Sequence, residues 1–183
     1  SKEALITSLW RRTLTGYEQE LTAVREYCLS KCAAPMTDVD SIAILVAVAQ
    51  EYAWQSRSQV SRFYFMMQAL TRESVLLPED VRPELMKGLF ALLGVIEEST
   101  GEAAKAGGLR AGNNRERTMT FWATLNGAMT LNKIGKTDPD DAPTGHLVQE
   151  MLMSLFRTWG AADETLVNAW KRGQGWHAQL KEN

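Results

Sequence analysis

Cysteine is scarce in this sequence: Cys28 and Cys32 are the only two thiols among 183 residues. Two cysteines are too few for the disulfide framework of a small secreted domain. A long apolar run is also missing, because the longest, Ile42–Ala49, is far shorter than the roughly 18 residues that a membrane-spanning helix needs. The start of the chain does not look like a signal peptide, since Lys2 and Glu3 are charged and an amphipathic segment follows. These absences predict a reduced, cytoplasmic protein.

An excess of positive charge is absent as well. Lysine and arginine total 20 against 22 aspartates and glutamates, which gives a net charge of −2. A chain that binds DNA by itself usually has a basic balance and a basic face, so any DNA binding is expected to reside outside this sequence. The length suits a single domain, residues 1–183. The chain opens without Met directly at a predicted helix, which suggests a fragment or the ordered part of a longer protein.

Helical periodicity dominates the sequence. Apolar residues recur at steps of three and four in almost every long segment, and no segment demands a strand. Capping side chains, prolines and glycines bound the segments. We therefore predict an all-α fold with helices at about Ser1–Cys32, Ser41–Gln55, Val60–Thr71, Pro83–Ala106, Asn113 or Asn114 to Ile134, Thr144–Trp159 and Asp163–Arg172. Gly173 and Gly175 are expected to loosen the chain after the last helix.

The second predicted helix is apolar on every side over Ile42–Ala49. Asp38 or Asp40 is predicted to cap its start. Taken alone, the apolar run would also suit a buried strand, but the segment continues to Trp54 without a turn signal, which favours a helix. A helix without a polar face is surrounded by protein, so we expect this one at the centre of the domain.

The fifth and sixth predicted helices carry apolar residues on more than one face, whereas a surface helix needs one stripe about 100° wide. The economical arrangement places one face toward the core and the other against a second copy, so that two helices from each chain form a four-helix bundle. Gly127 costs about 1 kcal/mol relative to alanine inside a helix and suits a close approach of backbones. The alternative is a larger intramolecular core without a dimer. The predicted interface residues are Leu125, Gly127, Met129, Val148, Met151, Leu152, Leu155 and Trp159.

Two short sequence motifs resemble those of a known protein family. Ser1–Ile6 (Ser-Lys-Glu-Ala-Leu-Ile) resembles the start of the fourth helix in regulators of the tetracycline-repressor family, where Lys/Ser-Lys-Glu-x-Leu follows the recognition helix. Phe121–Ala128 is similar to that family's Trp-Ala-x-x-x-Gly pattern in the dimer helix. The order of the predicted helices agrees with the family along the whole chain.

The resemblance implies a C-terminal ligand-binding and dimerisation domain, whose three-helix DNA-binding head is absent from this sequence. In such regulators, two heads read two half-sites that lie about one DNA turn apart. A small apolar or amphipathic ligand moves the connector helix, here Ser1–Cys32, so that the affinities for ligand and operator DNA are linked. The chain is then expected to belong to a homodimeric repressor that needs no cofactor or metal and that ligand releases from DNA.

The family reading also places a pocket between the first four helices of this chain. Methionine and aromatic side chains suit varied apolar ligands. Asn126 lies in an apolar helix and needs a hydrogen-bond partner if it is buried, from a ligand or across the dimer. Plain core packing is the alternative for each candidate. The other candidate lining residues are Tyr17, Trp54, Phe63, Met67, Met86, Phe90 and Trp122.

The remaining motifs are weaker. Cys28 and Cys32 are predicted to be reduced packing thiols, because their spacing in one helix disfavours a disulfide. Hydrolase, phosphate-loop and zinc motifs are absent, as is the Glu-x-x-His pair of di-iron bundles, so no catalytic residue is predicted. An all-helical adaptor that binds an unrelated protein, and an all-α enzyme, stay as alternatives. Side chains expected at the surface are His146, Asp138, Asp140, Asp141, Arg110, Arg115 and Arg117.

Overall fold

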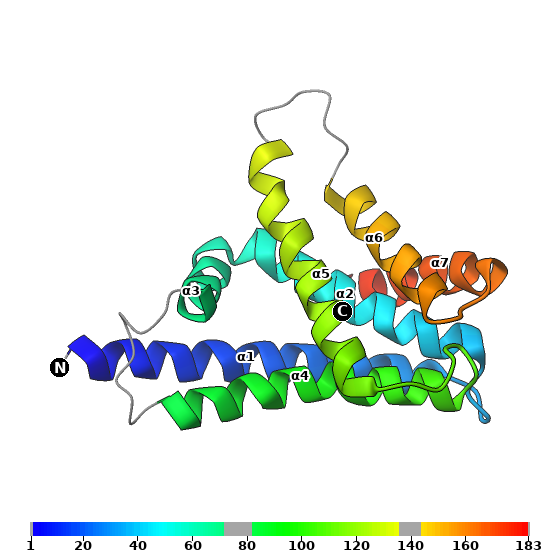
Figure 1. Cartoon of the computed structure of the whole chain (residues 1–183), viewed down its shortest axis with the longest axis horizontal. Helices are drawn as coiled ribbons and strands as arrows, with labels where there is room; N and C mark the ends of the chain where they lie inside the picture. Colours follow the sequence, from blue (N-terminus) through cyan, green and yellow to red (C-terminus); the bar gives the residue numbers. More distant parts are fainter. Residues whose placement is uncertain (1, 72–81, 136–143, 183) are drawn as a thin grey trace.

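Seven helices form the described part of the chain. The computed structural model describes residues 2–71, 82–135 and 144–182 (Figure 1). No strand occurs in these ranges, which confirms the predicted all-α class. No helix there is both long enough and apolar enough to cross a membrane. The helices are α1 (Lys2–Lys31), α2 (Asp38–Ser58), α3 (Val60–Thr71), α4 (Arg82–Lys105), α5 (Asn114–Gly135), α6 (Thr144–Thr158) and α7 (Asp163–Glu182).

The long helices α1 and α4 lie side by side and run in the same direction (Figure 1). Near their starts, Arg11 of α1 pairs with Glu84 of α4, with 2.8 Å between Nη2 and Oε2. Near their other ends, Arg25 pairs with Glu102 at 2.5 Å and with Glu98 at 3.3 Å. Because Arg11 and Arg25 are about four helical turns apart, α4 supports α1 along much of its length.

Helix α2 is the buried centre that its apolar sequence predicts. Every residue from Asp40 to Ala49 is buried, and α2 packs against α1, α3, α4, α5 and α7. Its start differs from the prediction, because Thr37 is the N-cap and Asp38 is the first helical residue. The Thr37 hydroxyl accepts a hydrogen bond from the backbone N–H of Asp40 at 3.0 Å, and the Asp40 side chain completes a capping box. This reciprocal pair satisfies two backbone N–H groups, which a lone aspartate cap does not.

Helix α7 continues to Glu182, so the expected loosening at Gly173 and Gly175 is wrong. Gly173 is buried against α2. A Cβ atom there would lie 2.5 Å from the carbonyl oxygen of Ala43 and 2.7 Å from the Cβ of Val46. Glycine thus allows the two helices to approach closely, and this packing outweighs the low helix propensity of glycine.

A buried carboxylate fixes the last turns of α7. Glu51 of α2 is 1% exposed and lies 2.9 Å from Nε2 of His177 and 2.7 Å from Nζ of Lys181. It also accepts a hydrogen bond from the Gln55 amide at 2.9 Å. Burial alone would raise the pKa of Glu51, but these hydrogen bonds hold it below its ordinary value. Glu51 therefore keeps its charge inside the fold and ties α7 to α2.

Replacing Glu51 by glutamine is expected to lower the free energy of unfolding at pH 7 by about 1.5 kcal/mol, because charge-assisted hydrogen bonds become neutral ones. The pKa of Glu51 is lower in the folded than in the unfolded protein. The charged carboxylate therefore stabilises the folded state fully at pH values above the unfolded-state pKa, and this stabilisation is lost as the pH falls through the folded-state pKa. The difference in the free energy of unfolding between wild type and variant should therefore become smaller at pH values below 4.5, the ordinary pKa of glutamate. Urea unfolding at several pH values measures it, and a gap that stays constant into acid would contradict the assignment.

Candidate ligand-binding site

An aromatic cluster occupies the space between α1, α2 and α3. The ring of Tyr52 on α2 lies 5.9 Å from that of Tyr17 on α1 and 6.0 Å from that of Phe63 on α3. The Tyr52 hydroxyl donates a hydrogen bond to Oδ1 of Asn126 on α5 at 2.6 Å. The Tyr17 hydroxyl is buried and has no hydrogen-bond partner in the described part of the chain. Burial raises the pKa of both tyrosines far above their ordinary value, so both phenols are neutral and suit hydrogen bonding rather than proton transfer.

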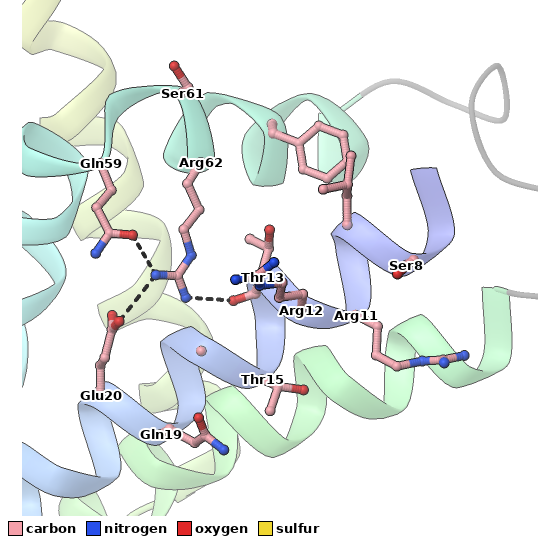
Figure 2. A pocket seen from close by; sticks show the side chains of 13 residues that line it. Ser8, Arg11, Arg12, Thr13, Thr15, Gln19, Glu20, Gln59, Ser61 and Arg62 are labelled. Atoms are coloured by element: carbon pink, nitrogen blue, oxygen red, sulfur yellow. Dashed lines mark hydrogen bonds and ion pairs between the residues drawn. The ribbon is translucent and has the colours of Figure 1, made fainter. Parts of the chain in front are cut away.

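A groove of about 870 Å³ opens between residues 8–20 of α1 and α3 (Figure 2). Most of its lining residues are polar and three are arginines, although apolar atoms supply most of its surface. None of the eight predicted ligand-binding residues belongs to it. Arg62 lines the groove and also stacks on the Tyr17 ring, with 4.5 Å between its guanidinium carbon and the ring centroid. The lining residues are Ser8, Leu9, Arg11, Arg12, Thr13, Thr15, Gly16, Gln19, Glu20, Gln59, Ser61, Arg62 and Phe65.

Arg62 fastens α3 to α1 across this groove. Its Nη2 donates to the backbone carbonyl of Thr13 at 3.0 Å. Its Nη1 donates to Glu20 at 3.2 Å and to Gln59 at 2.5 Å (Figure 2). A Cβ atom at Gly16 would lie 2.1 Å from Nη2 of Arg62. Glycine at this position therefore makes room for the guanidinium group directly against the α1 backbone.

The cations of the groove differ in how they are neutralised. Arg62 pairs with Glu20, and Arg11 pairs with Glu84 of α4. Arg12 forms no hydrogen bond or ion pair with any described residue. Glu20 is the only acidic side chain among the lining residues. The groove therefore has an excess of positive charge, centred on Arg12.

Three of the predicted ligand-binding residues, Tyr17, Phe63 and Asn126, lie together around Tyr52. Met67 and Trp122 are half-buried against the core. The other three, Trp54, Met86 and Phe90, are on the outer surface, with 37%, 37% and 44% of their areas exposed. Two of these rings are covered by cations: Lys181 lies 3.9 Å from the Trp54 centroid and Arg115 4.7 Å from that of Phe90.

Sequence reasoning did not find the groove because its residues form a polar helix face, which is typical of plain solvent exposure. One signal was available. Gly16 interrupts a long helix at a position where glycine is unfavourable, and such a glycine often marks a close approach. The basic partner that it accommodates, Arg62, comes from a distant segment and carries no sequence signature.

The predicted dimer residues divide into two sets. Leu125, Met129, Val148 and Leu152 are buried within this chain, where α5 and α6 pack on each other and on the core. Met151 and Leu155 are half-buried and line a groove of about 450 Å³ on the outer side of α5 and α6, together with Thr124, Glu150, Ser154 and Thr158. Gly127 is exposed, and a Cβ atom there would meet no other atom within 4 Å. Trp159 is half-buried, and its ring centroid lies 5.9 Å from that of Phe156.

The minor motifs can also be placed. Both cysteines are free thiols, and burial raises the pKa of Cys28 to about 12. The surface position expected for Arg117 is wrong, because Arg117 is 8% exposed and lies over the Trp159 ring. His146 and Arg110 are exposed as expected, whereas Asp138, Asp140 and Asp141 lie outside the described residues. Within residues 2–71, 82–135 and 144–182, no group of three or more His, Cys, Asp or Glu side chains is placed to hold a metal ion.

The chain was also compared with known proteins. No family model, no curated protein and no solved structure matches it.

Proposed function

We propose that this chain is the ligand-sensing and dimerisation domain of a transcription regulator of the tetracycline-repressor type. The observation that carries the proposal is the position of the groove on α1. This helix is one continuous element, Lys2–Lys31; its residues 8–20 border the groove, and Arg62 fastens it to α3. A ligand in the groove therefore acts on the helix that would lead to a DNA-binding head.

The outer face of α5 and α6 supports the second part of the proposal, a homodimer. Met151 and Leu155 present apolar surface beside a shallow groove, and Gly127 leaves the α5 backbone open to close contact. Two such faces related by a twofold axis would form a four-helix bundle. The proposed architecture is thus a cytoplasmic dimer in which each chain contributes two helices to the interface.

In this scheme, operator DNA is bound through heads that precede α1, and a small amphipathic ligand changes the separation of the two α1 helices. The separation matters because two half-sites lie about one DNA turn apart. Ligand and DNA then weaken each other's binding by the same factor, since their affinities are linked through one equilibrium. The scheme requires no cofactor and no catalytic step.

A thermal-shift screen tests the sensing role. Fatty acids, aromatic acids, hydrophobic cations and antibiotics are compared at equal concentration. A ligand at 100 times its Kd is expected to add about 2.7 kcal/mol to the free energy of unfolding, because it binds only the folded state. If no compound in these classes raises the melting temperature, the proposed ligand sensing is contradicted, and dimerisation is the only part of the proposed function that stands.

The 183-residue chain alone is expected not to bind DNA with sequence preference, because its net charge is −2. Gel-shift assays at two salt concentrations, with competing random duplex, measure this. A sequence-selective complex that survives the higher salt concentration would show that this chain binds DNA without a separate head, and would contradict the proposal that a separate head binds the operator.

A helical adaptor is the second candidate, and the outward face with Met151 and Leu155 favours it equally. An adaptor would use that face to bind an unrelated protein, and its α1–α3 groove would have no ligand. Sedimentation of the purified chain separates the two candidates, because the regulator is a dimer by itself and the adaptor associates only with its partner.

A further inference from the structure

We infer that the α1–α3 groove binds an organic monocarboxylate with an apolar tail, and that the carboxylate bridges Arg62 of α3 and Arg12 of α1. This inference rests on the proposed sensing function and names the chemical class of the ligand. The volume of about 870 Å³ lies within the range of small-molecule sites in proteins.

The contacts of Arg62 within the described residues use only part of its guanidinium group. A guanidinium group has five N–H donors, and Arg62 uses three of them, two from Nη1 and one from Nη2. The Nε–H and the second N–H of Nη2 have no acceptor among the described residues. Nε and Nη2 lie on one edge of the guanidinium group, and such an edge can match the two oxygens of a carboxylate. Arg62 can therefore hold α3 against α1 and still bind a carboxylate.

The uncompensated positive charge of the groove lies on Arg12. Arg12 lines the groove, has no partner in the described part of the chain, and is the neighbour of Thr13, whose carbonyl accepts from Arg62. Figure 2 draws the Arg12 side chain on the Thr13 side of Arg62, opposite Glu20 and Gln59. An anion in the groove thus meets two guanidinium groups, whereas a cation would meet only Glu20, which Arg62 already neutralises.

Apolar side chains line the same groove. Leu9 lines it and is 45% exposed, and Phe65 lines it from α3. The Phe65 ring lies 6.4 Å from that of Trp10, which is buried directly behind. A short aliphatic or aromatic tail would cover Leu9 and Phe65, and Trp10 would report its arrival through a change in fluorescence. A single molecule would then connect α1 and α3 at both its ends.

The test measures the binding of octanoate by calorimetry and by tryptophan fluorescence. Octanol and octylammonium carry the same tail with no charge or the opposite charge, and acetate carries the charge without the tail. Octanoate should bind at least tenfold more tightly than octanol or octylammonium, because only the anion can form an ion pair with the guanidinium groups and accept two parallel N–H groups at once. Acetate lacks six CH₂ groups and should bind at least about a hundredfold more weakly, since burying each CH₂ is worth roughly fourfold in affinity and burial of about four of them already gives this factor.

Matched variants locate the site. Arg12→Gln should weaken octanoate about tenfold, whereas Arg157→Gln, which removes an exposed arginine of α6 outside the groove, should not. Leu9→Ser should weaken octanoate and leave acetate unchanged, with Leu5→Ser, 62% exposed and outside the groove lining, as its control. Arg12, Leu9 and both control residues are exposed, so each variant is expected to fold.

Equal affinity for octanoate and octanol, or equal effects of Arg12→Gln and Arg157→Gln, would overturn the inference. If octanoate does not bind but another class in the screen stabilises the chain, the carboxylate site is wrong and the sensing function stands. If no compound stabilises the chain, both fail. These results are distinguishable because the screen and the variant series are separate measurements.

Discussion

Replacing Leu155 by glutamate is expected to turn the proposed dimer into a monomer. Leu155 lines the outer groove of α5 and α6, and a carboxylate there would be buried without a partner in an apolar interface. Such a burial costs several kcal/mol, so the dimer dissociation constant should rise by about 100-fold or more. Sedimentation equilibrium between micromolar and millimolar protein concentrations measures the shift.

Val167→Glu is the matched control, because Val167 is 46% exposed on α7 and the substitution adds the same charge away from α5 and α6. It should leave the dissociation constant unchanged. A glutamate at Leu125, a predicted interface leucine of α5, cannot test the dimer. Leu125 is 1% exposed within the chain, and a glutamate there would unfold the protein itself. A wild type that sediments as a monomer at all concentrations would contradict the dimer outright.

Replacing Gly173 by alanine is expected to destabilise the fold by about 3 kcal/mol. The added methyl group would lie 2.5 Å from the carbonyl oxygen of Ala43, a backbone atom of the central helix that cannot move aside alone. Overpacking of this kind costs from 1 to 3 kcal/mol and sometimes more, and here it exceeds the gain of about 1 kcal/mol in helix propensity. Denaturant unfolding monitored by circular dichroism gives the difference directly.

Gly175 is the control for this prediction, since it lies in the same helix and a Cβ atom there would meet nothing within 4 Å. Gly175→Ala should stabilise the protein by up to about 1 kcal/mol. Opposite signs for two identical substitutions two residues apart would locate the close contact of α2 and α7. Two stabilising substitutions would show that the helices do not approach as described.

Much of the fold could be predicted from the sequence, because helical periodicity and capping residues are local signals. The central position of α2 followed from an apolar run with no polar face. The end of α7 could not be predicted, because Gly173 is held by packing against Ala43, a contact between distant segments. The buried contacts of Glu51 could not be predicted for the same reason, because its partners His177 and Lys181 are far along the chain.

Sequence reasoning found part of the aromatic cluster beside the groove but no residue that lines the groove itself. Tyr17, Phe63 and Asn126 were expected near one another, and the structure brings them together around Tyr52. Apolar excess alone could not distinguish the inner face of α5 and α6, with Leu125 buried, from the outer face. The groove was missed for a related reason: a single helix face rich in serine, threonine and arginine has the pattern of solvated surface until a second helix is seen beside it.

The central claim is that ligand binding changes the separation of two α1 helices in a dimer. It is tested most directly by electron–electron double resonance on a Lys2→Cys variant that carries a spin label at the start of α1. Cys32 is replaced by serine, and Cys28 is buried and unreactive. The account predicts one intermolecular distance, which shifts by several ångströms when the most stabilising compound of the thermal screen is added. No intermolecular distance, or a distance unchanged with that compound bound, would contradict it.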